Sequence, residues 1–521
     1  MNTSWAVTEQ QAMAIDLFPL FAQIPASTVR TPCCARRLRS GLGAGVLALL
    51  SGCTLLGPNY VAPTLSSTEV PEQWTSKTNA TGENVTPDNK QAAPGNWWSE
   101  LADPVLDRLV GAAFATSPTL EAALARVSQS RALYAQSNAS ALPSAQGGAG
   151  NDTSQSDNTG GIFNQSWLSL GAAWEIDLFG AVQRGKEAAK ARTESQQATL
   201  ADVRVSLAAD VTDAYLSYRA CQSYEALSAE DVASRLATEK LTAASVREGF
   251  TAPYLAIRSR ASVAEAKTQL AATHAFCERQ ENLLTRLTGI PRPELMTALA
   301  DKPTGLDRLP VPRHFDIAIP SQALTQRPDI RAAERRLAAE SAAIGVAEAD
   351  RYPRLTLNGA LGYSAGSGVS LGSWSFGPSF SLPIFDGGRR QAAVEQAKSK
   401  YDEALADYRA KTRAAIQEVE DGLTRYAAAH ERAENARTSA NQYQRFFDSV
   451  EIRYREGASN LLELEDARRA MLGAQQTLLS VQQERLQAWV ALNRATGGAA
   501  LYDPTPARPL ETAGARTTPV N

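Results

Sequence analysis

The sequence predicts a mainly α-helical fold with a small membrane β component, built from two tandem copies of one unit. Three observations predict it: segments that recur at a nearly constant offset, helical hairpins of great length, and pairs of strands without partners in their own copy. The 521 residues are 44% hydrophobic and 21% charged, which is enough apolar material for a folded core. A net charge of -3 provides no basic surface, so we expect no nucleic-acid partner.

Four segments recur in the same order along the chain, at offsets of about 206 to 210 residues. They predict two copies, 116–300 and 326–500, joined by a connector at 301–325. The paired segments are 118–143 with 328–353, 170–180 with 376–386, 246–249 with 454–457, and 284–289 with 492–497.

Each copy is expected to begin with a helix that ends near Pro143 or Pro353, followed by two strands. Loops rich in Gly, Ser, Asn and Asp are placed between the strands, at about 147–165 and 364–373. Apolar residues alternate at Leu355, Leu357, Trp374 and Phe376. The aromatic residues Trp167, Trp174, Tyr363 and Trp374 suit membrane interfaces, and closure of the strands into a barrel by oligomerisation would remove their open edges.

A helix of great length follows the strands in each copy. Residues 184–247 lack proline and contain one glycine, which predicts a helix of about 90 Å at 1.5 Å per residue. Apolar residues at spacings of three and four indicate coiled-coil packing, and a second helix returns over 254–288. The second copy repeats this hairpin over 389–455 and 461–496.

The N-terminal region has the features of a lipoprotein signal. Four arginines precede an apolar run at 42–50, which is too short to span a membrane, and Leu50-Ser51-Gly52-Cys53 resembles the bacterial lipobox. We therefore expect 1–52 to comprise an extra N-terminal extension, 1–28, followed by a signal peptide, with the true start near Val29. Cys53 is then lipidated and 53–115 is a lipidated N-terminal segment. Thr54, in place of Asp, permits export to the outer membrane. The alternative is a chance cysteine near an uncleaved anchor.

Two further cysteines are positioned for a disulfide. Cys221 and Cys277 each lie 28 residues from Gly249, where the first hairpin turns, so they face each other on its apolar seam. In an oxidising compartment this geometry predicts a disulfide, and two buried free thiols are the alternative.

The sequence lacks the motifs of catalytic and cofactor sites. The three histidines, His274, His314 and His430, have no metal-ligand spacing, and neither a phosphate-binding loop nor a nucleophile elbow occurs. We expect no enzyme activity and no cofactor. The Pro-, Thr- and Arg-rich tail at 501–521 is expected to be disordered.

The two-fold repeat, the lipobox and Asn96-Trp97-Trp98-Ser99-Glu100-Leu101-Ala102-Asp103-Pro104 together resemble the outer-membrane factors of tripartite efflux pumps, the TolC/OprM superfamily, and within it the NodT-type lipoproteins. The resemblance implies a homotrimer whose protomers each give four strands to one 12-stranded β-barrel in the outer membrane. The barrel continues into a long periplasmic α-helical barrel, with 53–115 and 300–325 in an equatorial belt. The implied partners are a periplasmic adaptor, an inner-membrane RND pump and outer-membrane lipid, and the duct passively exports drugs or other small toxic compounds.

The same resemblance implies a gate at the periplasmic hairpin turns, Gly249 and Gly457. By position, Glu463 and Asp466 match acids that line the constriction, and Tyr454 matches a tyrosine that ties the closed state. The alternative is an ordinary helix start, where acids are favoured by the helix dipole. The family's acid and arginine partners of that tyrosine are replaced here by Leu255 and Ser459.

Two alternative functions are compatible with some of these sequence features. One is a type I protein-secretion duct, and the other is a structural envelope lipoprotein. The lipobox and the NodT-like features favour efflux. Because the pump selects the cargo, the identity of the substrate, the pump and the adaptor is not encoded in this chain.

Overall fold

A computed structural model describes residues 55–63, 70–71, 73–76, 96–155, 162–300, 309–310, 312, 320–366 and 369–498. Every described residue belongs to one compact unit, Thr54–Asn521. The expected signal peptide, lipidated Cys53 and tail 501–521 lie outside the described residues, as do His314 and most of the connector.

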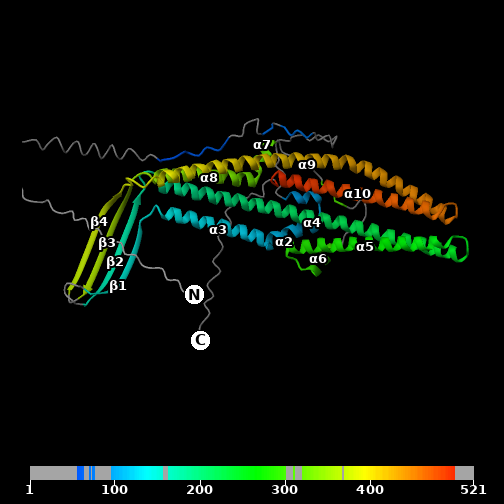
Figure 1. Cartoon of the computed structure of the whole chain (residues 1–521), viewed down its shortest axis with the longest axis horizontal. Coiled ribbons are helices and arrows are strands. Elements are labelled where there is room, and N and C mark those ends of the chain that lie inside the picture. The colour runs from blue at the N-terminus through cyan, green and yellow to red at the C-terminus, as the bar shows by residue number, and fades with distance from the viewer. Residues whose placement is uncertain are drawn as a thin grey trace, which may run out of the picture. The chain divides into compact units, whose positions relative to one another are not determined.

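The described unit is mainly helical with one small antiparallel sheet, which confirms the predicted fold class (Figure 1). The element order helix, two strands, long helix, returning helix occurs twice, with 22-residue first helices and 67-residue long helices in both halves. The first set is α3 (Pro118–Ala139), β1 (Ser144–Gln155), β2 (Ile162–Ile176), α4 (Ala181–Arg247) and α5 (Pro253–Thr288). The second is α8 (Pro328–Ala349), β3 (Arg354–Gly366), β4 (Val369–Ser381), α9 (Arg389–Arg455) and α10 (Leu461–Ala495).

Short helices connect and flank these two sets. The 3-10 helix η1 (Trp97–Leu101) and α2 (Pro104–Thr116) precede the first set, and α6 (Arg292–Leu299) and α7 (Pro320–Gln326) lie between the two. The segment from Trp97 to Pro104 has a structural role here. Both tryptophans are buried, and the Asp103 side chain caps α2 by accepting a hydrogen bond from the Val105 amide at 3.0 Å.

The expected interstrand loops were wrong. β1 and β2 extend through most of 147–165, and β3 and β4 through most of 364–373. Glycine, serine and asparagine indicate a loop in a water-exposed chain, but here residues of these types lie within paired strands and make up most of one face of the sheet. Backbone pairing to neighbouring strands stabilises these residues, although they lack strong strand propensity.

The four strands pair in the order β1-β2-β3-β4, all antiparallel, and the register sorts their side chains by polarity. Leu170, Leu361 and Trp374 lie side by side on one face, which also carries Trp174, Tyr363, Phe376 and Phe380. All seven are exposed, up to 79% for Trp374. The opposite face is mostly Gly, Ser, Ala, Thr and Asn. The sheet therefore has an apolar face and a polar face, and in a single chain β1 and β4 are open edges.

Trp167 does not belong with the other aromatic residues. It is separated from Trp174 by an odd number of positions along β2, so it lies on the opposite, polar face. The expectation that Trp167 contributes to the same aromatic set as Trp174, Tyr363 and Trp374 is therefore wrong, because successive side chains of one strand alternate between its two faces.

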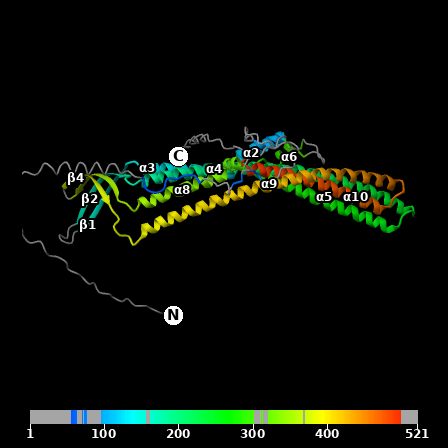
Figure 2. The same cartoon turned by 90° about the horizontal axis from the view of Figure 1, so that it is seen from above.

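The long helices run side by side as two hairpins, α4 with α5 and α9 with α10 (Figures 1 and 2). Each 67-residue helix extends for about 100 Å. α4 also contacts α10 and α8, so the two hairpins pack on each other. Where α2, α4 and α6 meet, a compact apolar core forms around Trp97, Leu106, Leu109 and Tyr215. Among the described helices, none is both long enough and apolar enough to cross a membrane.

Candidate gate at the hairpin tips

The two hairpins turn in the same way. Gly249 and Gly457 follow α4 and α9 with φ of +78° and +76°, the left-handed conformation that glycine adopts without strain. Each amide donates back to a carbonyl of the last helical turn, Gly249 to Val246 and Gly457 to Tyr454, both at 3.1 Å. An added Cβ would meet nothing within 4 Å at either glycine, so backbone conformation rather than space selects this residue.

Glu463 is held in place by three contacts at the start of α10. Its amide donates to the Asn460 side chain at 2.9 Å, which caps the helix. Its carboxylate accepts from the Ser459 hydroxyl at 2.6 Å and pairs with Arg453 at 3.1 Å. Ser459, which stands where the family's arginine was expected, thus takes part in ordering the acid. Glu463 is both a feature of an ordinary helix start and a fixed charge at the tip.

Asp466 lies one turn further along α10 on the same face as Glu463. Its side chain is 55% exposed and forms an ion pair with Arg469 on the same helix. Exposed pairs of this kind contribute about 0 to 1 kcal/mol. Asp466 is therefore positioned by its helix rather than by contacts with the other hairpin.

Tyr454 connects the two hairpins. Its hydroxyl lies 3.0 Å from the Thr242 hydroxyl of α4, and the two share a hydrogen bond. Its ring packs against the apolar cluster that includes Phe447 and Leu464. With Leu255 in place of the family's acid, the tyrosine bonds a neutral threonine, so the latch expected from the family is replaced by a hydroxyl pair.

A buried arginine also joins the two hairpins near the tip. Arg468 of α10 is fully buried and donates to Ser234 at 3.1 Å and to Thr238 at 2.8 Å, both on α4. It also forms an ion pair with Glu465 on its own helix. A guanidinium with no water around it depends on these acceptors.

Glu465 extends the same buried cluster to the other side of the first hairpin. Its carboxylate accepts from the Ser262 hydroxyl of α5 at 3.0 Å. Arg235 of α4 lies 3.7 Å from Glu465, donates to Ser262 at 2.6 Å and pairs with Asp231 at 2.9 Å. Arg235, Glu465 and Arg468 are thus buried between α4, α5 and α10, and Asp231 lies beside them, partly buried. We call Asp231, Arg235, Glu465 and Arg468 the buried charge cluster.

Sequence reasoning singled out Glu463 and Asp466 and missed the buried charge cluster. A signal for it is present in the heptad spacing of α10. Leu461, Leu464, Arg468, Met471 and Gln475 all fall at spacings of three and four and are all buried, so an arginine occupies a core position of the seam. What it contacts could not be read from the spacing, since its partners lie on a different hairpin.

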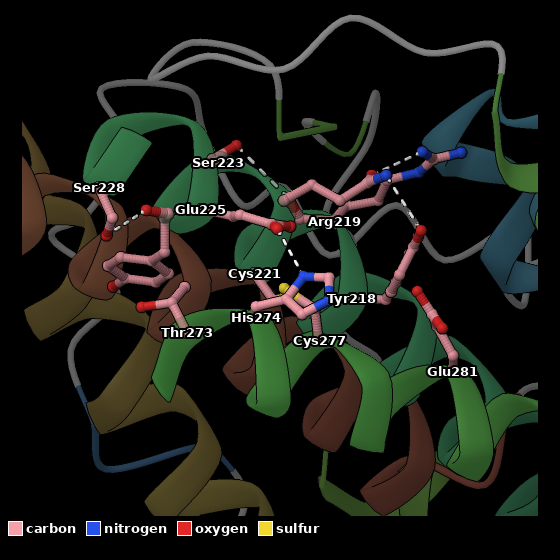
Figure 3. Close-up of a disulfide and its surroundings, with 12 residues drawn as sticks. Tyr218, Arg219, Cys221, Ser223, Glu225, Ser228, Thr273, His274, Cys277 and Glu281 are labelled. Atoms are coloured by element: carbon pink, nitrogen blue, oxygen red, sulfur yellow. Dashed lines mark hydrogen bonds and ion pairs between the residues drawn. A yellow bond between two sulfur atoms is a disulfide. The ribbon is translucent and has the colours of Figure 1, made fainter. Parts of the chain in front are cut away.

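Cys221 of α4 and Cys277 of α5 are joined as a disulfide, with Cα atoms 5.6 Å apart (Figure 3). Both residues are buried on the seam of the first hairpin. Beside them the His274 ring lies 2.8 Å from the Glu225 carboxylate, and this hydrogen bond raises the pKa of His274. In the second hairpin the matching positions are Ala429 and Arg485, so the staple is confined to the first.

One helical turn before the disulfide, α4 is tied to the short helices. The Tyr215 hydroxyl donates to Asp103, the cap of α2, and accepts from Arg219 at 3.0 Å. Arg219 also donates to the Leu299 carbonyl at the end of α6 at 3.1 Å. Burial raises the pKa of Tyr215, so it remains a hydrogen-bond donor. Within the part of the chain that the structure describes, no cluster of three or more His, Cys, Asp and Glu side chains could hold a metal ion.

Comparison with known proteins places this architecture in a family. Residues 109–290 and 319–498 match the model described as "Outer membrane efflux protein". Nodulation protein T of Rhizobium leguminosarum bv. viciae is 30% identical over 88% of this chain and 93% of its own length. The toluene efflux pump outer membrane protein TtgF of Pseudomonas putida is 30% identical over 90% of this chain and 98% of its own. The solved outer-membrane channel OprN is 30% identical, with a TM-score of 0.76 over 85% of this chain and 99% of its own.

The fold of repeated hairpins and a small sheet matches that of a solved outer-membrane channel. The chain belongs to the outer membrane efflux protein family, and it is an outer-membrane channel of an efflux system. The resemblance to the TolC/OprM superfamily is thereby confirmed.

Proposed function

We propose that the protein is a passive homotrimeric duct that carries drugs or other small toxic compounds out of the cell, supplied by a periplasmic adaptor and an inner-membrane RND pump. The observation that carries this proposal is the four-stranded sheet. Its apolar face is exposed, its other face is polar, and both edges are open. Closure with the sheets of two further copies makes 12 strands, removes the edges and puts the apolar face toward lipid.

The tip contacts support a closed resting state of this duct. Three residues of the second hairpin bond to the first: Tyr454 of α9, and Glu465 and Arg468 of α10. Opening the tip requires the hairpins to separate. Separation would expose these polar groups to water or leave them without hydrogen-bond partners. In this proposal the pump and adaptor supply the work of opening.

Lipid attachment at Cys53 is the second part of the proposal. Cys53 lies three residues before Leu56 in the sequence. The Leu56 carbonyl accepts a hydrogen bond at 3.0 Å from Arg184, which is buried at the start of α4. Replacing Cys53 by serine is expected to abolish incorporation of labelled palmitate. Full incorporation into the Cys53→Ser variant would contradict the assignment, and the neighbouring Thr54→Ser variant is the matched control.

Single-channel conductance in a planar bilayer tests the duct and its acidic gate. The wild-type protein is expected to give a small, cation-selective conductance. In a trimer the Glu463→Ala/Asp466→Ala variant removes six carboxylates from the tip, so its conductance should rise and its cation selectivity fall. Glu484→Ala, an acid of the same helix away from the tip, should leave both unchanged.

The other outcomes are equally informative. Conductance unchanged in the double variant would keep the duct and assign the gate to other residues. A trimer without any conductance would instead favour the structural envelope lipoprotein.

A further inference from the structure

The polar face of the sheet carries a feature that neither barrel closure nor the tip gate explains. Among the side chains described on this face, Trp167 and Leu371 are the only large apolar ones. They flank Ser364, which pairs with both residues across the register. Trp167 lies five residues after Ile162, where β2 begins, and nine before Ile176, where β2 meets the helices. The pair is therefore nearer the outer end of the strand.

The indole of Trp167 lies where side chains on Gly150 and Gly148 would collide with it. A Cβ on Gly150 would lie 2.7 to 2.8 Å from three atoms of the ring, and one on Gly148 would lie 3.0 Å from it. Both glycines have ordinary φ, so their backbone conformation does not require glycine. Their lack of side chains lets the ring lie flat on β1.

A carboxylate fixes the edge of the ring. The Trp167 indole nitrogen donates to Asp152 at 2.9 Å, across the β1–β2 pair. Asp152 is exposed, and 36% of Trp167 is exposed although one face of its ring rests on the glycines. The other face of the ring and a negative charge beside it are thus presented together on the polar side of the sheet.

We propose that Trp167 and Asp152 form a binding platform for planar aromatic cations inside the bore. This inference rests on the proposed closure of the sheet into a barrel, which turns the polar face inward. An aromatic cation can stack on the free face of the indole, where the ring quadrupole and the carboxylate both favour positive charge. Three protomers place three such platforms around the outer part of the channel, where they act as a last contact for departing solutes.

Equilibrium binding of ethidium to the trimer in lipid nanodiscs tests the platform. Wild type is expected to bind saturably, and Trp167→Ala should weaken binding by about three- to tenfold, the range expected for losing a stacked cation–π contact. Gly150→Ala keeps the tryptophan but forces its ring off β1, so it should weaken binding as well. Trp174→Phe, on the same strand but the apolar face, is the matched control and should bind as wild type.

A charge test separates the two halves of the platform. Asp152→Asn should weaken ethidium binding while leaving binding of neutral phenanthridine unchanged, whereas Trp167→Ala should weaken both. Equal ethidium affinity in wild type and Trp167→Ala, or no saturable binding by wild type, would overturn the platform while a trimeric, conducting channel stands. A protein that neither trimerises nor conducts would instead refute the proposed function.

Discussion

Replacing Arg468 by methionine is expected to give the largest rise in channel conductance of any single substitution near the tip. Methionine fills similar space without charge, so Ser234 and Thr238 lose their donor and Glu465 loses its own-helix partner. Removing one partner of a buried pair costs about 3 to 5 kcal/mol. Because this cost falls on the closed contact between the hairpins, the tip should open more often, and single-channel recording should show several-fold higher mean conductance.

The neighbouring arginine offers the control. Arg469 pairs with Asp466 on the solvent side of the same helix, so Arg469→Met should change conductance little. Thr238→Val removes one acceptor on α4 while keeping shape, and should give an intermediate effect. A stable Arg468→Met trimer with wild-type conductance would show that the buried charge cluster does not hold the tip closed.

Loss of the disulfide is expected to cause the largest fall in stability. We propose that Cys221 and Cys277 are bonded in the cell, closing a 56-residue separation. In the chain-entropy model a loop of this length contributes about 4 kcal/mol, because the cross-link restricts the unfolded chain. The Cys221→Ser/Cys277→Ser variant should therefore lose its trimer at lower temperature, or faster at a fixed temperature, than wild type.

Two further measurements complete that test. Ala429 occupies the matching buried position of the second hairpin, so Ala429→Ser controls for placing a hydroxyl on the seam. Thiol titration of unfolded, unreduced wild type should find neither cysteine reactive. Two reactive thiols in that titration would establish free cysteines and remove the reason for the stability difference.

The helices could be predicted closely because their signals are local. Long stretches without proline, together with Gly249 and Gly457 at the turns, gave boundaries within a few residues of the structure. The facing positions of Cys221 and Cys277 likewise follow from helical rise and the place of the turn. The sheet was harder: a strand of β1 composition resembles a loop until it is paired, since its stability comes from neighbours that lie far away in the chain.

The recurring segments, the length of the hairpins and the seam positions follow from the sequence alone, because each can be read along the chain. The contacts of Trp167 with Gly150 and Asp152, and those of Arg468, became clear only from the folded chain. The reason is similar in both cases. The pairing register of β1 and β2 sets which residues lie beside Trp167, and a buried charge is stabilised by acceptors on another hairpin, so neither set of contacts can be read from local spacing.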